Sequence, residues 1–62
     1  MYKYLDLHIK IYEDKNKTKE KEIYLYNIKD VEFFKNYITF KDNKNTSFIY
    51  KIKDIIYIYT LK

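Results

Sequence analysis

Two stretches, YNIKDV at Tyr26–Val31 and YKIKDI at Tyr50–Ile55, share one pattern: Tyr-x-Ile-Lys-Asp followed by a β-branched residue. Alternating apolar residues lead into each Ile, and apolar residues resume after each Asp. Asp is unfavourable inside a strand, and its carboxylate readily accepts hydrogen bonds from nearby backbone N–H groups in turns. The pattern therefore predicts two pseudo-repeated β-hairpin units, with the chain turning a corner at Asp30 and again at Asp54.

The length of 62 residues predicts a single domain, residues 1–62. A domain this small buries only about 60% of the surface of its unfolded chain. Small domains usually need a disulfide, a metal or a partner subunit to be stable. The chain has no Cys and a single His, so it has no disulfide and no His cluster for a metal. We therefore expect a homo-oligomer without a cofactor or metal.

The charge is carried by 13 Lys against nine acidic residues, which leaves a net charge of +4. Residues 13–22 hold four Lys and four acidic residues, so the positive excess lies in the rest of the chain. A basic balance favours anionic partners. Arg is absent, which disfavours sequence-specific reading of DNA bases. Lys, Ile, Tyr and Asn have AT-rich codons, which suggests a low-GC bacterium, a phage or another mobile element.

Alternation of apolar and polar residues predicts an all-β fold of about six antiparallel strands. The strands are expected at residues 2–12, 23–28, 31–34, 37–41, 46–52 and 55–61. Residues 13–22 are expected to form a mobile polar loop, and Lys35-Asn36 a tight turn. The predicted core contains Leu5, Leu7, Ile9, Ile11, Ile23, Leu25, Val31, Phe33, Ile38, Phe40, Ile52, Ile56 and Ile58. A competing interpretation is a short helix over 28–36, capped by Asn27.

Short strands at this spacing predict a meander that closes into a small barrel or packs as two three-stranded sheets. The hairpin that begins IKDV at Ile28–Val31 and returns through ITFKD at Ile38–Asp42 resembles the SH3-like small barrels. That group includes the Sm-like RNA-binding proteins and small archaeal chromatin proteins. The resemblance covers about residues 5–59 in strand order. It implies an SH3-like barrel and transfers no individual site residue.

The last predicted strand is apolar on both faces, and a chain of this size cannot cover both. We therefore expect the oligomer interface to consist of Ile55, Ile56, Tyr57, Ile58 and Tyr59. This run is far shorter than a membrane span. Residues 1–12 alternate unlike a signal peptide, so the cytoplasm is the expected location, that of the host if the gene belongs to a phage.

Nine Tyr and 13 Lys point to a binding surface. On the first two strands, aromatic and basic residues fall opposite the apolar stripe. A sheet face of this kind can stack nucleobases on Tyr and pair phosphates with Lys. The candidate ligand-binding residues are Tyr2, Tyr4, His8, Lys10, Tyr12, Tyr24 and Tyr26. The same tyrosines also suit a protein interface, where Tyr is enriched, or serve only as good cross-strand residues.

Catalysis is not expected. Ser47 is the only Ser and His8 the only His, and no Gly is present to form a nucleophile turn or phosphate loop. The sequence therefore predicts a non-catalytic protein that holds an anionic nucleotide ligand, such as RNA, DNA or a small signalling nucleotide. The alternative is a phage or mobile-element protein that covers and inhibits a host or defence protein, as anti-CRISPR proteins do.

Overall fold

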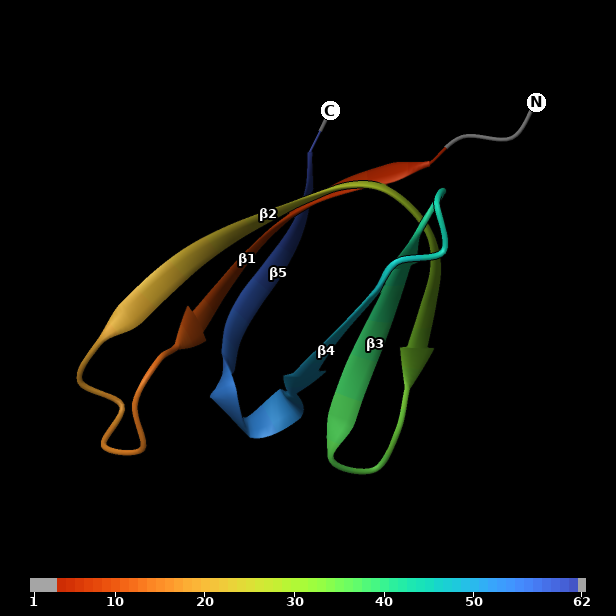
Figure 1. Ribbon diagram of the computed structural model, residues 1–62. Helices are drawn as coiled ribbons and strands as arrows, with labels where there is room; N and C mark the ends of the chain where they lie inside the picture. Colours follow the sequence, from red (N-terminus) through yellow and green to blue (C-terminus); the bar gives the residue numbers. More distant parts are fainter. Residues whose placement is uncertain (1–3, 62) are drawn as a thin grey trace.

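The structure, a computed structural model, describes residues 4–61. It contains five strands and one 3₁₀ turn: β1 (Leu5–Tyr12), β2 (Glu20–Phe33), β3 (Tyr37–Asp42), β4 (Ser47–Lys51), η1 (Ile52–Asp54) and β5 (Ile55–Leu61). All neighbouring strands are antiparallel, and they lie in the order β4-β3-β2-β1-β5 (Figure 1). The predicted all-β meander is confirmed. The competing helix over 28–36 is wrong, because the chain stays extended as far as Phe33.

Five strands replace the predicted six because the second and third expected strands are one 14-residue strand, β2. Asn27 has a positive φ of 58°, and the pairing register shifts between Ile28 and Asp30. These two irregularities bend β2 over the molecule instead of ending it (Figure 1). Asp30 is therefore inside β2, opposite Lys41, and the corner predicted at Asp30 is wrong.

The second copy of the pattern does turn the chain. β4 ends at Lys51, the 3₁₀ turn η1 spans Ile52–Asp54, and β5 begins at Ile55. The corner predicted at Asp54 is thus confirmed. The two copies share a sequence pattern but not a structure, since one is a bend within a strand and the other a turn between strands.

The bend in β2 divides the sheet into two halves. The first half of β2 pairs with β1, which in turn pairs with β5, and the second half pairs with β3, which pairs with β4. Leu25 and Ile28 are both buried although they are three residues apart. The extra residue at the bend therefore lets both halves of β2 turn apolar side chains towards the same core.

Six of the described residues are buried and form the core, Leu7, Ile9, Leu25, Ile28, Ile38 and Phe40. All but Ile28 were predicted, and Ile11, Ile23 and Ile58 pack against this cluster partly buried. Five other residues of the predicted core are exposed: Leu5, Val31, Phe33, Ile52 and Ile56. Phe33 lies opposite buried Ile38 but is 74% exposed. Phe33 is the last residue of β2.

The bend at Asn27 provides a stability test. Asn tolerates a positive φ, whereas a β-branched residue in this conformation costs about 1–2 kcal/mol of folding free energy. The Asn27 backbone N–H donates to Asp6 Oδ1 at 3.0 Å, and its carbonyl accepts from Asn43 N–H at 2.9 Å. Asn27 takes part in both hydrogen bonds through its backbone alone, so neither bond depends on its side chain. We expect Asn27→Val to destabilise the fold by about 1–2 kcal/mol in urea unfolding, and Asn27→Gly to change stability little. Equal stabilities for the two variants would contradict this interpretation of the bend.

The expected loop at residues 13–22 is shorter than predicted, because Glu20–Glu22 already belong to β2. The remainder is a turn organised by Asp14. Its carboxylate accepts hydrogen bonds from the backbone N–H of Thr18 at 2.9 Å and of Lys19 at 3.1 Å, and from the Thr18 hydroxyl. The hydroxyl bond from Thr18 and the backbone bond from Lys19 are the main reasons that the pKa of Asp14 is lowered.

This lowered pKa predicts an acid-sensitive turn. A carboxylate whose folded pKa lies below its unfolded value stabilises the fold fully above the unfolded pKa, about 3.9 for Asp. That contribution is lost as pH falls through the folded pKa. We therefore expect Asp14→Asn to lower the melting temperature by a constant amount from pH 7 down to about 4, with the difference shrinking at lower pH. A difference that grows on acidification would contradict the assignment.

Candidate functional site

The predicted ligand-binding residues that the structure describes lie on the outer face of β2, β1 and β5. In β1, Leu7 and Ile9 point into the core, so His8 and Lys10 point outward. Cross-strand pairing places Tyr24 opposite His8. We call this surface the tyrosine face, and it comprises His8, Lys10, Tyr12, Glu20, Glu22, Tyr24, Tyr26, Tyr57 and Tyr59. The exception is Tyr4, which is exposed but precedes β1 and is not placed on this face by the strand pairing of the described residues. Tyr2 was predicted to belong to it but lies outside the described residues.

Two tyrosines of the predicted oligomer interface also lie on this face. Tyr57 pairs with Lys10 and Tyr59 pairs with His8 across the β1–β5 ladder. The aromatic rings form a continuous cluster: His8 stacks on Tyr24 with ring centroids 4.6 Å apart, and meets Tyr57 edge-on at 5.4 Å. Tyr57 and Tyr59 lie 4.6 Å apart. Such packing fixes the rings in place before any ligand binds.

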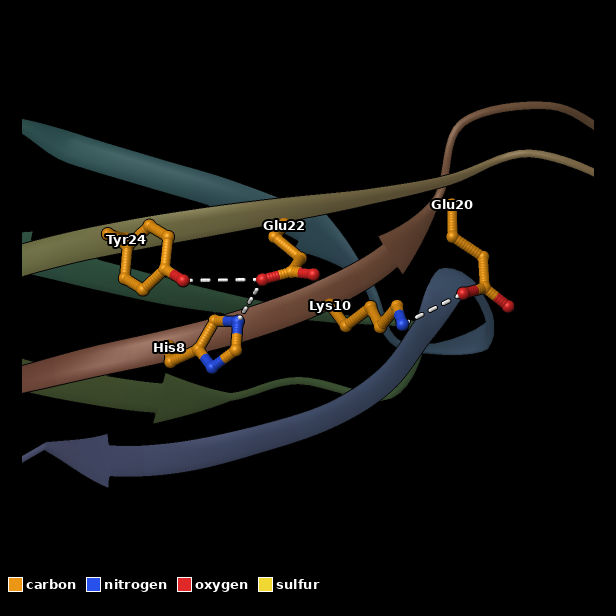
Figure 2. Close-up of polar contacts among 5 residues, drawn as sticks. All are labelled: His8, Lys10, Glu20, Glu22 and Tyr24. Atoms are coloured by element: carbon orange, nitrogen blue, oxygen red, sulfur yellow. Dashed lines mark hydrogen bonds and ion pairs between the residues drawn. The ribbon is translucent and has the colours of Figure 1, made fainter.

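The two basic side chains of the tyrosine face, His8 and Lys10, each contact a glutamate (Figure 2). His8 Nε2 lies 3.0 Å from Glu22 Oε1, which also accepts a hydrogen bond from the Tyr24 hydroxyl at 3.2 Å. Lys10 Nζ lies 3.0 Å from Glu20 Oε1. Because the Lys10 ammonium and the His8 imidazole each have a glutamate partner, this face offers little net positive charge to an anionic ligand.

The pKa shifts agree with these contacts. The pKa of Lys10 is raised, chiefly by its hydrogen bond to Glu20 and by the charge of that carboxylate. The pKa of Tyr24 is raised by desolvation first and by the hydrogen bond to Glu22 second. Lys10 therefore stays an ammonium and Tyr24 a neutral phenol at physiological pH. Neither is poised for acid–base chemistry.

Sequence reasoning missed the two glutamates because it assigned residues 13–22 to a loop. A signal was present in the sequence. Ile23 and Leu25 fall on one face of the second strand, and the same alternation places Glu20, Glu22 and Tyr24 together on the opposite face. Extending the second strand backward by three residues would have placed both carboxylates beside His8 and Lys10.

A second surface, which we call the basic groove, lies between the β2–β3 turn and η1. It has a volume of about 530 Å³ and is lined by Lys35, Asn36, Tyr37, Lys51, Ile52 and Lys53. The pairing of β3 with β4 sets Tyr37 opposite Lys51, and Ile52 N–H donates to the carbonyl of Asn36 at 3.0 Å. The groove therefore joins two turns that are distant in sequence but tied by the backbone.

The lysines that line the basic groove form no direct ion pair with a described carboxylate. The groove lining contains three lysines and no acidic residue. Among residues 4–61, no carboxylate lies within 4.0 Å of the ammonium groups of Lys35, Lys51 and Lys53. Acidic residues are near, since Lys51 and Lys53 also border a groove with Glu13, Asp14 and Asp54. The three lysines are thus available to an anion.

An aromatic pair stands beside the lysines. Tyr37 is 40% exposed and stacks on Phe34, which is 44% exposed, with ring centroids 4.8 Å apart. Phe34 N–H donates to the carbonyl of Tyr37 at 2.8 Å, which holds the two residues together across the turn. An aromatic surface next to several lysines is the combination used to hold single-stranded nucleic acid.

Sequence reasoning predicted the turns at Lys35-Asn36 and Asp54 but not that they meet. Their proximity depends on β3 and β4 pairing so that Tyr37 faces Lys51. Each turn carries Lys, at Lys35 in the first and at Lys51 and Lys53 in the second, and that was the only signal available in the sequence.

Other kinds of site find little support. Within the described part of the chain, no cluster of three or more His, Cys, Asp or Glu side chains could hold a metal ion. The described residues include no helix with the length and apolar character needed to cross a membrane. In comparisons with known proteins, no family model, no curated protein and no solved structure matches the chain.

Proposed function

We propose that the protein is a non-catalytic binding protein for single-stranded nucleic acid, held in the basic groove. The observation that carries this proposal is the set of three lysines without a carboxylate partner beside an exposed aromatic pair. In this arrangement Lys35, Lys51 and Lys53 contact phosphates. A base stacks on the exposed part of Tyr37.

The expected affinity follows from these contacts. Stacking a base on an aromatic side chain contributes about 1–3 kcal/mol, and each lysine–phosphate contact adds a salt-sensitive term. One base and three phosphates correspond to micromolar binding. Arg is absent from the chain, so bidentate base reading is not available. The ligand is therefore bound by shape and charge, with little base preference.

The tyrosine face was the surface predicted from sequence to bind this ligand, and that remains a prediction. Its exposed Tyr24 and Tyr26 could stack bases, but Glu20 and Glu22 offset the cations beside them. The charge distribution therefore favours the basic groove as the primary site.

We further propose that the five strands are those of an SH3-like small barrel. The meander order and the bend that lets β2 serve both halves of the sheet support this assignment. This barrel is open, because the two edge strands in the described part of the chain, β4 and β5, do not pair with each other.

The direct test is a fluorescence anisotropy titration of short labelled single-stranded RNA and DNA. For single strands log K falls with log salt by about 0.7 for each neutralised phosphate. Three lysine contacts therefore predict about 20-fold weaker binding when salt rises from about 50 to about 200 mM. Absence of binding below about 100 µM at low salt, the non-specific range, would overturn the proposal.

A second candidate function is protein binding through the tyrosine face. It is supported by Tyr26 and Tyr59, about 58% and 60% exposed, on a face whose charges are internally compensated. Tyr is enriched and unpaired charge depleted in interface centres. The partner would be a host or defence protein in the cytoplasm, where we place this protein. Tyr26→Ala separates the two functions, because it should leave nucleic-acid binding unchanged and weaken binding to a protein partner.

A further inference from the structure

The last strand, β5, forms one edge of the sheet. Among the described residues it pairs only with β1. Its seven residues, IIYIYTL at Ile55–Leu61, include no charged side chain and no Pro. An edge strand presents a row of unpaired backbone N–H and C=O groups, which is a template for another strand.

Other edges of this sheet are protected. β4 has only five residues and ends at Lys51. The exposed second half of β2 carries Asp30 and Glu32 and follows a register shift. Short length, charge and bulges are the usual protection of sheet edges. β5 has one irregularity, opposite the step from Lys10 to Ile11, and none over Tyr57–Leu61.

We propose that β5 pairs antiparallel with β5 of a second copy of this chain, on a two-fold axis at Ile58. Tyr59 then lies opposite the partner's Tyr57, and Leu61 lies opposite the partner's Ile55. Cross-strand aromatic pairs stabilise antiparallel sheets. The ring centroids of Tyr57 and Tyr59 are 4.6 Å apart within the chain. In the dimer, this pair of rings would lie next to the same pair of the second copy.

The charge pattern selects a second copy as the occupant. β5 carries no charged side chain, so antiparallel pairing with a second copy sets no like charges opposite each other anywhere along the strand. The monomer also has a core of only six buried residues. Association stabilises the folded state by mass action. The inference is independent of nucleic-acid binding, because β5 contributes no residue to the basic groove.

The test is a charge exchange followed by native mass spectrometry and light scattering at tens of micromolar. The wild-type chain is expected to be a dimer. Tyr57→Lys/Tyr59→Lys sets Lys opposite Lys twice across the axis and should give monomers, as should Tyr57→Glu/Tyr59→Glu. An equimolar mixture of the two should restore a mixed dimer. The control, Tyr24→Lys/Tyr26→Lys, makes the same charge change on β2 of the same face and should remain a dimer.

A second measurement uses the wild-type protein and therefore tests the proposal even if the variants fail to fold. Hydrogen exchange of wild-type amides on the free edge of β5 should slow as protein concentration rises, while exchange in β4 stays unchanged. The proposal is overturned if the wild type is a monomer, if it forms a ring of three or more copies, or if protection in β5 is independent of concentration. If both variants fold but no mixed dimer forms from them, the proposed register is also overturned.

Discussion

Lys51→Glu/Lys53→Glu is expected to weaken single-stranded nucleic-acid binding by about 100-fold or more at low salt. The two reversals remove two phosphate contacts and place two negative charges against the same phosphates. Both side chains line the basic groove and have no carboxylate partner among the described residues. The slope of log K against log salt should become about 1.4 less steep, which is about 0.7 for each lost lysine contact, and only the contact at Lys35 remains.

The matched control is Lys19→Glu/Lys44→Glu, which changes the net charge equally but touches residues outside the groove. It should reduce affinity only slightly through the overall field of the protein. Anisotropy titrations over a range of salt concentrations compare the two variants, and circular dichroism checks that each remains folded. Equal losses in the two would show that net charge, and not the groove, holds the ligand.

Phe40→Ala is expected to remove a large part of the free energy of unfolding of the protein. Phe40 is the largest of the fully buried side chains, at 1% exposure, and it bridges β3 to β4 by lying opposite Phe48. Removing a buried Phe costs about 3–5 kcal/mol. A domain of this length has a total stability of only about 3–9 kcal/mol. The chain has no disulfide to limit the loss.

The control for this variant is Ile49→Ala on neighbouring β4, where the side chain is 65% exposed. Surface changes of this kind usually alter stability by no more than about 0.5 kcal/mol. Urea unfolding followed by tyrosine fluorescence measures both. A loss below about 1 kcal/mol for Phe40→Ala would show that the core lies elsewhere.

The fold was predictable from sequence in the middle of β1 and of β3, where apolar and polar residues alternate. Leu7 and Ile9 in β1, and Ile38 and Phe40 in β3, were assigned to the core correctly. The alternation failed at Asn27, because one residue with positive φ shifts the pattern without ending the strand. Asp30 then looked like a turn residue, although its place inside β2 is set by pairing with Lys41. Propensity alone does not distinguish a bent strand from two strands.

The candidate sites were predictable only in part. Alternation in β1 correctly set His8 and Lys10 on the face opposite the core. Their neutralisation by Glu22 and Glu20 depends on where β2 begins, which a run of polar residues concealed. The basic groove depends on the meeting of two turns, and such proximity follows from strand pairing that a single sequence does not specify.

The most direct test of the nucleic-acid site is an NMR titration of the ¹⁵N-labelled protein with a short single-stranded RNA. We expect the largest amide shift changes at residues 34–37 and 51–54, which border the basic groove. Amides of His8, Lys10 and Tyr24 on the tyrosine face should change little. The largest changes at those three residues, with none at 51–54, would contradict the account and return the site to the tyrosine face.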